Sequence, residues 1–161
     1  MIQQLNSFVS DNLKATLLLR AFGVAKVPLL FLCSPKVIKI NDQSCAIEMP
    51  YRKIIKNHLG SVYFGALAIG ADACVGLLSI DKIHKSGKKV NLIFKSFHAE
   101  FLKRAEGPVV FQCDHGPLIQ EMIDETLQSG ERVNQVIPAY ALVHEEPVAQ
   151  FELELSLKLK P

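Results

Sequence analysis

Asp72 is the only charged side chain between Ser61 and Ile80, in a segment that is otherwise apolar. A buried carboxylate without a partner is unfavourable, so such a residue needs a role. We expect burial in an apolar helix to raise the pKa of Asp72, which suits a general base acting on water. The carboxylate could instead attack a carbonyl carbon as a nucleophile. The structural alternative is an aspartate that is hydrogen-bonded at a subunit interface.

Several polar residues shortly before Asp72 could act with it. Asn57 could orient water or polarise a carbonyl through its amide, or it could cap a turn. Ser61 is expected to cap the following helix. Tyr63 could donate a hydrogen bond to a substrate or pack in a core or interface. We expect His58 to be a solvent-facing loop residue.

The start of the predicted helix offers a second chemical feature. A helix that begins near Phe64 has free N–H groups and a partial positive charge at that end. The amides of Phe64 and Gly65 would then point at a substrate and could stabilise charge on a carbonyl oxygen, as an oxyanion hole does.

Composition narrows the class of protein. The 161 residues suit one domain, and a net charge of +2 without a basic patch argues against nucleic-acid binding. The central aspartate and three glycines make the apolar segment a core helix and not a membrane span. The N-terminus does not resemble a signal peptide. The four cysteines are expected to be reduced core residues, which fits the cytoplasm, and no spacing indicates a metal site.

The predicted elements form an α+β domain. An amphipathic helix is expected over residues 3 to 20, with Leu5, Phe8, Val9, Leu13, Thr16, Leu17 and Arg20 at helical spacing. Prolines 28 and 35 bracket LLFLCS, which we expect to be an apolar lid or edge segment and not a helix. A hairpin over 36–49, a loop over 50–59 and the helix over about 64–80 follow.

The second half of the chain is rich in predicted strands. Strands are expected over 89–104, after residue 108, over 132–144 and over 151–160. A short helix is expected to start at His115-Gly116-Pro117 and to run to Gln128, closed by Ser129-Gly130. The sequence FELELSLKLK alternates apolar and polar residues, as a half-buried antiparallel strand does. A long antiparallel sheet wrapped around the apolar helix satisfies these patterns.

The stretch NHLGSVYFG, followed by ALAIGAD, resembles the signature of hotdog-fold acyl-CoA thioesterases, in particular those of the phenylacetate pathway. The pattern Asn-x-x-Gly-Thr/Ser-x-His-Gly-Gly, with an acidic residue seven positions later, is met at Asn57, Gly60, Ser61, Gly65 and Asp72. The chain also resembles a group of uncharacterised hotdog domains of unknown function. Tyr63 stands where the family has His, and Phe64 stands where it has the first Gly of the pair.

The resemblance implies a hotdog fold over residues 36–161, with residues 1–35 as an N-terminal helical extension. It implies hydrolysis of acyl-CoA or acyl-carrier thioesters without a further cofactor, coenzyme A being part of the substrate. The partner of the chain would be a second copy, in a homodimer or a dimer of dimers with sites at the protomer interface. It assigns catalysis to Asp72 and Asn57, and substrate binding to Gly60, Ser61, Tyr63, Phe64 and Gly65.

Three other functions remain open. A non-catalytic acyl or acyl-CoA binding protein is favoured by Phe64, which changes the shape of the site. A hotdog dehydratase would need a histidine, and His58 is the only nearby candidate. A purely structural domain would have an occluded pocket. The apolar residues Leu29 to Leu32 could cover an acyl tunnel or lengthen the core.

Cys74 and a group of cationic residues are the remaining candidates for a role in the site. Cys74 lies on the opposite helix face from Asp72 and is expected to be a core residue. A cationic set could hold the phosphates of coenzyme A or form a solvated face: Lys82, Lys85, Lys88, Lys89, Lys95, Lys103 and Arg104.

Overall fold

The computed structural model describes the backbone of residues 2–160 and the side chains of residues 11–160. Its elements follow the predicted order, apart from a short second helix and a 3-10 turn that were not predicted. They are α1 (Ile2–Lys26), α2 (Pro28–Cys33), β1 (Lys36–Ile40), β2 (Cys45–Met49), the 3-10 turn η1 (Lys53–Ile55), α3 (Phe64–Lys85), β3 (Val90–Phe101), β4 (Val109–Cys113), α4 (Gly116–Ser129), β5 (Val133–Val143) and β6 (Glu146–Leu159).

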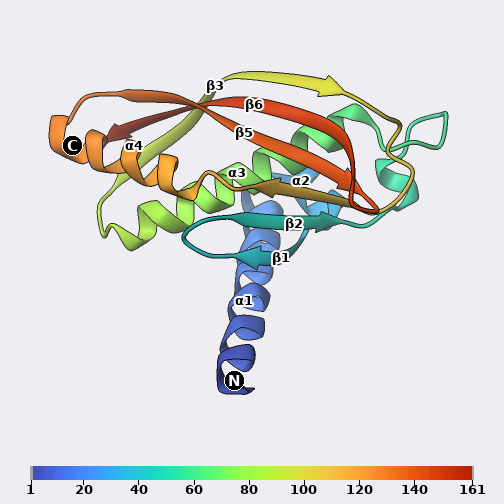
Figure 1. Cartoon of the computed structure of the whole chain (residues 1–161), viewed down its shortest axis with the longest axis horizontal. Coiled ribbons are helices and arrows are strands. Elements are labelled where there is room, and N and C mark those ends of the chain that lie inside the picture. The colour runs from blue at the N-terminus through green and yellow to red at the C-terminus, as the bar shows by residue number, and fades with distance from the viewer. Residues whose placement is uncertain (1, 161) are drawn as a thin grey trace.

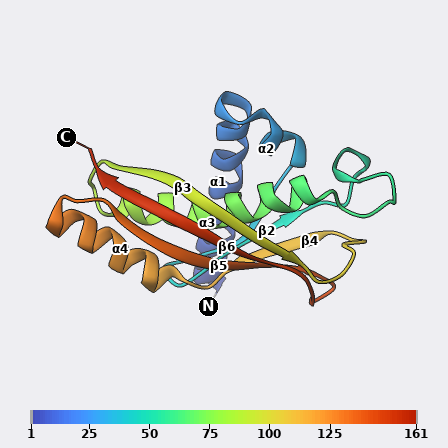
Figure 2. The ribbon, with the colours of Figure 1, turned by 90° about the horizontal axis from the view of Figure 1, so that it is seen from above.

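The strands form one six-stranded antiparallel sheet in the order β1-β2-β4-β5-β6-β3. The long strands β3, β5 and β6 arch over α3, which runs along the concave side of the sheet (Figure 1). Seen from above, α4 lies on one side of this layer and α1 and α2 on the other (Figure 2). The architecture is the predicted sheet wrapped around one central apolar helix.

The core lies between α3 and the concave face of the sheet. In β6, Phe151, Leu153, Leu155 and Leu157 are buried, as the alternating sequence predicts. The prediction for Ser156 is wrong. This residue was expected on the polar face of the strand, but it is buried. Arg132 covers it and donates a hydrogen bond from Nη1 to its Oγ at 2.9 Å.

The central helix is less enclosed than predicted. One stripe of α3 remains open in the single chain, along Asp72, Gly76 and Ile80, which follow one another about one turn apart. Asp72 and Ile80 are exposed. Phe64 at the helix start is also exposed, but it points in another direction, because eight positions leave an offset of about 80°. The groove forms along this stripe.

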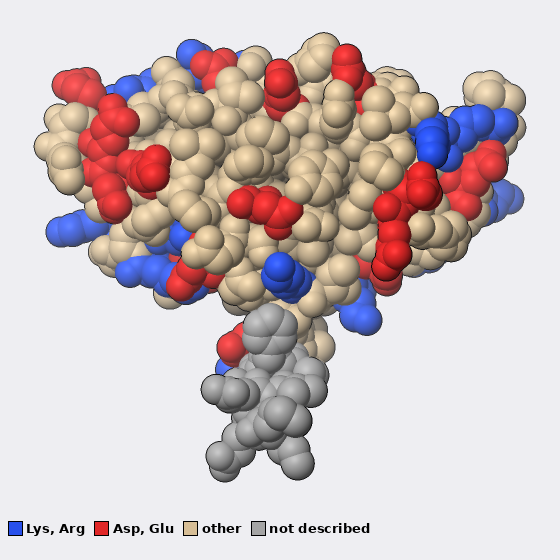
Figure 3. Space-filling view, viewed as in Figure 1, with Lys and Arg blue, Asp and Glu red and all other residues tan. Residues whose placement is uncertain are grey.

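By length and composition alone, α3 is long and apolar enough to span a membrane. No other helix among the described residues meets these two criteria. Half of its most apolar window is buried within the protein. It is therefore the core helix of the sheet. Charges of both signs are scattered over the face of the molecule shown in Figure 3.

The helix α1 exists as predicted, but its contact face is only partly the predicted one. Thr16 and Arg20 of the predicted set contact the body, and Thr16 is buried, whereas Leu13 and Leu17 are each 59% exposed. The predicted positions Leu5, Phe8 and Val9 lie outside the described side chains.

Hydrogen bonds to the edge strand explain this orientation. Asn12, Thr16 and Arg20 stand one turn apart, and Asn12 Nδ2 donates to the carbonyl of Ile38 at 2.9 Å. Thr16 Oγ1 accepts the N–H of Val37 at 2.9 Å, and Arg20 Nε donates to the carbonyl of Pro35 at 3.2 Å. This polar row covers backbone groups of β1 that would otherwise lie at a free sheet edge.

The expectation that residues 29–34 do not form a helix is wrong. They form most of α2, which begins at Pro28 and ends at Cys33. Proline is favoured in the first turn of a helix because the N–H that it lacks has no partner there. Leu30 and Cys33 of α2 are buried against the body, and Ser34 ends the helix with a left-handed backbone.

Candidate active site

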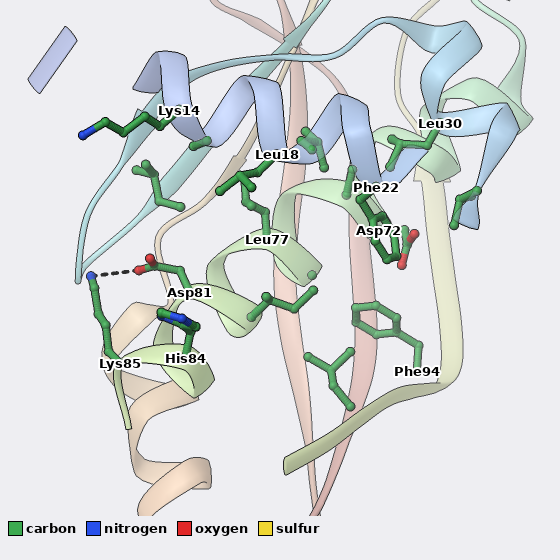
Figure 4. Close-up of a pocket in the computed structure, with 18 of the residues that line it drawn as sticks. Lys14, Leu18, Phe22, Leu30, Asp72, Leu77, Asp81, His84, Lys85 and Phe94 are labelled. Atoms are coloured by element: carbon green, nitrogen blue, oxygen red, sulfur yellow. Dashed lines mark ion pairs between the residues drawn. The ribbon is translucent and has the colours of Figure 1, made fainter. Parts of the chain in front are cut away.

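An apolar groove of about 800 Å³ lies along the open stripe of α3. Its walls come from five elements: α1, α2 and β1, which are consecutive in the sequence, and α3 and β3, which follow later. Figure 4 shows Asp72 at one end, beside Phe22 and Leu30, while Asp81, His84 and Lys85 stand at the other end. Asp72 is therefore a carboxylate at the end of a long apolar groove.

The prediction that Asp72 is buried needs a correction. The side chain is exposed in the single chain, since it faces the open groove. The surrounding protein still displaces part of its hydration, and this desolvation raises its pKa, in the direction predicted. Asp72 forms no ion pair with any described residue, so no cation offsets the increase in its pKa that desolvation causes.

The amides predicted to form an oxyanion hole lie at the start of α3, as expected. Tyr63 is the N-cap residue, and its own N–H donates to the carbonyl of Ile55 at 2.8 Å. The N–H groups of Phe64 and Gly65 have no acceptor among the described residues. They are available to a carbonyl oxygen, and the partial positive charge of the helix end reinforces them.

Aromatic side chains surround these amides. The rings of Tyr63 and Phe64 have centroids 4.7 Å apart, and Phe101 lies 6.3 Å from Phe64. A Cβ at Gly65 would come within 2.4 Å of the Tyr63 ring. A side chain at position 65 would therefore displace the Tyr63 ring, and the site differs in shape from one with His-Gly-Gly.

The loop that contains Asn57 is held by its own side chains. Asn57 Oδ1 accepts the N–H groups of Leu59 at 2.9 Å and Ser61 at 3.1 Å. Gly60 takes a left-handed backbone with φ of 83°, which glycine allows without strain. Tyr51 donates its hydroxyl to the carbonyl of Gly60. The side-chain oxygen of Asn57 therefore caps its own turn, while its amide nitrogen has no acceptor among the residues that the structure describes.

Ser61 does not cap α3 as predicted. It is buried, and its hydroxyl accepts a hydrogen bond from Arg104 Nε at 2.9 Å. Arg104 also donates to the carbonyl of Leu59 at 2.7 Å, so it fixes the loop from outside. Sequence reasoning missed this positioning role, because Arg104 is 43 residues away from Ser61 and no local pattern links them.

The predicted site residues form two groups. Asn57, Gly60 and Ser61 lie in the loop that leads into the helix start, whereas Asp72 is eight residues further along α3 than Phe64. At 1.5 Å per residue this is about 12 Å along the axis. One thioester carbonyl therefore cannot contact the free amides and Asp72 of the same chain.

Other candidate groups have structural places. Cys74 is buried and donates to the carbonyl of Cys45 at 3.3 Å, and its pKa is raised well above the ordinary value, which confirms a core residue. His58 is exposed in its loop, as expected. Several of the cations over 82–104 are paired with acids: Lys85 with Asp42 and Asp81, Lys95 with Glu154, Lys103 with Glu146 and Arg104 with Glu106.

Comparison with solved structures establishes the class of fold. A protein of unknown function from Chlorobaculum tepidum matches with a TM-score of 0.79 at 11% identity, over 92% of this chain and 97% of that chain. A thioesterase enzyme from Staphylococcus aureus, solved as a point variant, has a TM-score of 0.63 at 16% identity, over 81% and 98%. A thioesterase from Pseudomonas aeruginosa, also a variant, has a TM-score of 0.65 at 14% identity, over 88% and 92%.

The wrapped sheet and its central helix define a hotdog fold, as the resemblance implied. Over residues 15–157 the sequence matches the model of a family described as a domain of unknown function, DUF4442. The chain belongs to this family. The search of curated proteins found no match.

Proposed function

We propose that this protein hydrolyses acyl thioesters, with Asp72 as general base. The observation that carries this proposal is a carboxylate of raised pKa at the end of an apolar groove, on the same helix as two free N-terminal amides. Thioesterases among the proteins of similar fold support the same chemistry.

The site needs two protomers, because about 12 Å of helix separates Asp72 from the amides of its own chain. In the proposed homodimer, the amides of Phe64 and Gly65 in one protomer bind the carbonyl oxygen. Asp72 from the second protomer takes a proton from water, and the water oxygen bonds to the carbonyl carbon. The C–S bond then breaks, and Asp72 returns the proton to the thiolate. The products are a carboxylic acid and a free thiol.

The edge strand β3 supports this dimer. It pairs with β6 on one side only, and its twelve residues leave the other side unpaired within the chain. The opposite sheet edge, β1, is already covered by the polar row of α1. Pairing of β3 with its copy would remove the remaining open edge.

We expect light scattering of the purified protein to give at least twice the 17.9 kDa mass of one chain. The proposed divided site requires a second copy, and the unpaired edge of β3 offers a surface for it. A single-chain mass at micromolar concentration in a protein that still hydrolyses thioesters would contradict the two-protomer site.

We expect kcat/KM to fall about tenfold per pH unit on the acid side of its profile. The base must be ionised, and desolvation places the pKa of Asp72 above the ordinary aspartate value of 3.8, so the acid limb lies at higher pH than for a solvated aspartate. Stopped assays between pH 4 and 8 measure it. A rate that does not change over this range would argue against Asp72 as the base.

Thiol release from a panel of acyl-CoAs, short, long and aromatic, tests the function. Turnover with at least one acyl-CoA is expected.

A non-catalytic acyl-CoA binding protein is the second candidate. The Tyr63 ring over Gly65 favours it, since this ring narrows the approach to the amides. Saturable binding of an acyl-CoA without thiol release would establish this alternative and contradict hydrolysis.

A further inference from the structure

We propose that the groove along α3 binds the acyl chain of the substrate and selects medium-length chains of about ten carbons, with the N-terminal extension as its outer wall. This inference rests on the proposed function, because it names the substrate class of the same site.

The groove has the composition that an alkyl chain requires. Leu18, Leu19 and Phe22 of α1 face Ala73 and Leu77 of α3 across it. Figure 4 shows Leu18 and Leu77 directed toward one another between the two helices. Without α1 this stripe of the central helix would lie open, so the extension turns an exposed helix face into a binding groove.

Polar groups stand at the two ends of the groove and not along its middle. Asp72 marks the end where the thioester carbonyl is proposed to lie. At the other end, Lys85 Nζ pairs with Asp81 at 2.8 Å and with Asp42 at 2.7 Å. A methyl group pushed against these ion pairs would displace their hydration, which is unfavourable.

The length between these ends sets the chain length. Asp72 and Ile80 bound the apolar floor and are eight residues apart, which is about 12 Å along a helix. An extended alkyl chain with bonds of about 1.5 Å advances roughly 1.3 Å per carbon. The floor therefore matches a chain of about ten carbons, and a longer chain would reach Asp81 and Lys85.

Gly76 offers a place to shorten the groove. It lies in the floor one turn from Asp72, and a Cβ built there meets only Phe94, at an ordinary contact of 3.9 Å. Packing therefore does not require glycine at this position, in contrast to Gly70, where a Cβ would lie 2.2 Å from the Phe111 ring. A side chain added at position 76 points into free space where the chain is proposed to run.

The test compares wild type with Gly76→Leu and Gly76→Ala. Thiol release gives kcat/KM for straight-chain acyl-CoAs of 4 to 16 carbons, and calorimetry measures the binding of their non-hydrolysable thioether analogues. Thermal unfolding and light scattering show whether each variant keeps its fold and assembly. Gly76→Ala is the matched control, since it makes the same change in helix propensity with a single added methyl.

In wild type, we expect each added methylene to raise kcat/KM about threefold to fourfold up to about ten carbons and then no further. In Gly76→Leu the ratio of decanoyl to butyryl kcat/KM should fall at least tenfold, with a smaller fall in Gly76→Ala. The thioether analogues should lose binding in the same order.

Failure of this inference is distinguishable from failure of the proposed function. Chain-length-dependent analogue binding that Gly76→Leu weakens, without thiol release, would keep the groove assignment and overturn hydrolysis. Thiol release with the same chain-length profile in all three proteins would overturn the groove assignment alone. An altered mass in Gly76→Leu with an unchanged profile would also overturn it, because the groove would then be an interface between copies.

Discussion

Asp72→Asn is expected to lower kcat/KM for thioester hydrolysis by about 10²–10⁴-fold, the usual contribution of a general base. The amide has nearly the same shape as the carboxylate but cannot take a proton from water. Thiol release with the best acyl-CoA of the panel measures the effect.

The same substitution should not unfold the protein. The folded-state pKa of Asp72 is raised above its unfolded value, so its contribution to stability is fully present below the unfolded pKa and is lost as pH rises through the folded-state pKa. At pH 7 the ionised side chain therefore opposes folding. Asp72→Asn should leave the free energy of unfolding at pH 7 equal to or above that of wild type.

A matched control makes the same chemical change away from the groove. Asp124 is exposed on α4, where it accepts a hydrogen bond from Gln120 at 3.0 Å. Asp124→Asn should keep kcat/KM within about twofold of wild type, since surface substitutions have small effects. Equal kcat/KM for wild type and a folded Asp72→Asn variant would remove Asp72 from the mechanism.

Phe111→Ala is expected to lower the free energy of unfolding by about 3–5 kcal/mol. Phe111 is fully buried in β4, where its ring packs over Gly70 of α3 and lies 6.4 Å from the Phe151 ring. Truncation leaves a cavity between the sheet and the central helix. Urea denaturation at a fixed protein concentration measures the loss, since an oligomer's stability depends on concentration.

A double-mutant cycle ties this effect to the close approach of helix and sheet. Gly70→Ala alone should destabilise by about 1–3 kcal/mol, because its Cβ would lie 2.2 Å from the Phe111 ring. In the Phe111→Ala background the same methyl enters vacated space and should be neutral or stabilising. Additive effects of the two substitutions would show that the ring and Gly70 do not meet.

Local patterns in the sequence were sufficient for most elements of the fold. The alternation in FELELSLKLK predicts β6, and Ser129-Gly130 predicts the end of α4, where Gly130 takes the left-handed C-cap conformation. Such signals work because they depend on neighbours a few residues away, through the period of two in strands and the cap geometry of helices. The resemblance of Asn57, Gly65 and Asp72 to the hotdog thioesterase pattern also places the loop and the helix correctly.

The tertiary structure alone decided which side chains of α1 contact the body and how far α3 is enclosed. The spacing of α1 suggests that Leu13 and Leu17 pack inward. The helix is instead held to β1 by a hydrogen bond that Asn12 donates and one that Thr16 accepts, and the two leucines stay exposed. The position of Asp72 at a groove, and not in a closed core, depends in the same way on where α1 and β3 end up.

The sequence by itself therefore determined the class of fold, the order of its elements and the carboxylate that is proposed to act. The groove, the Arg104 anchor of the loop and the separation of Asp72 from the helix amides appear only in three dimensions. The physical reason is that each of these features depends on contacts between segments that lie far apart in the chain. Ser61 and Arg104 are an example, because no local periodicity in the sequence indicates that these two residues meet.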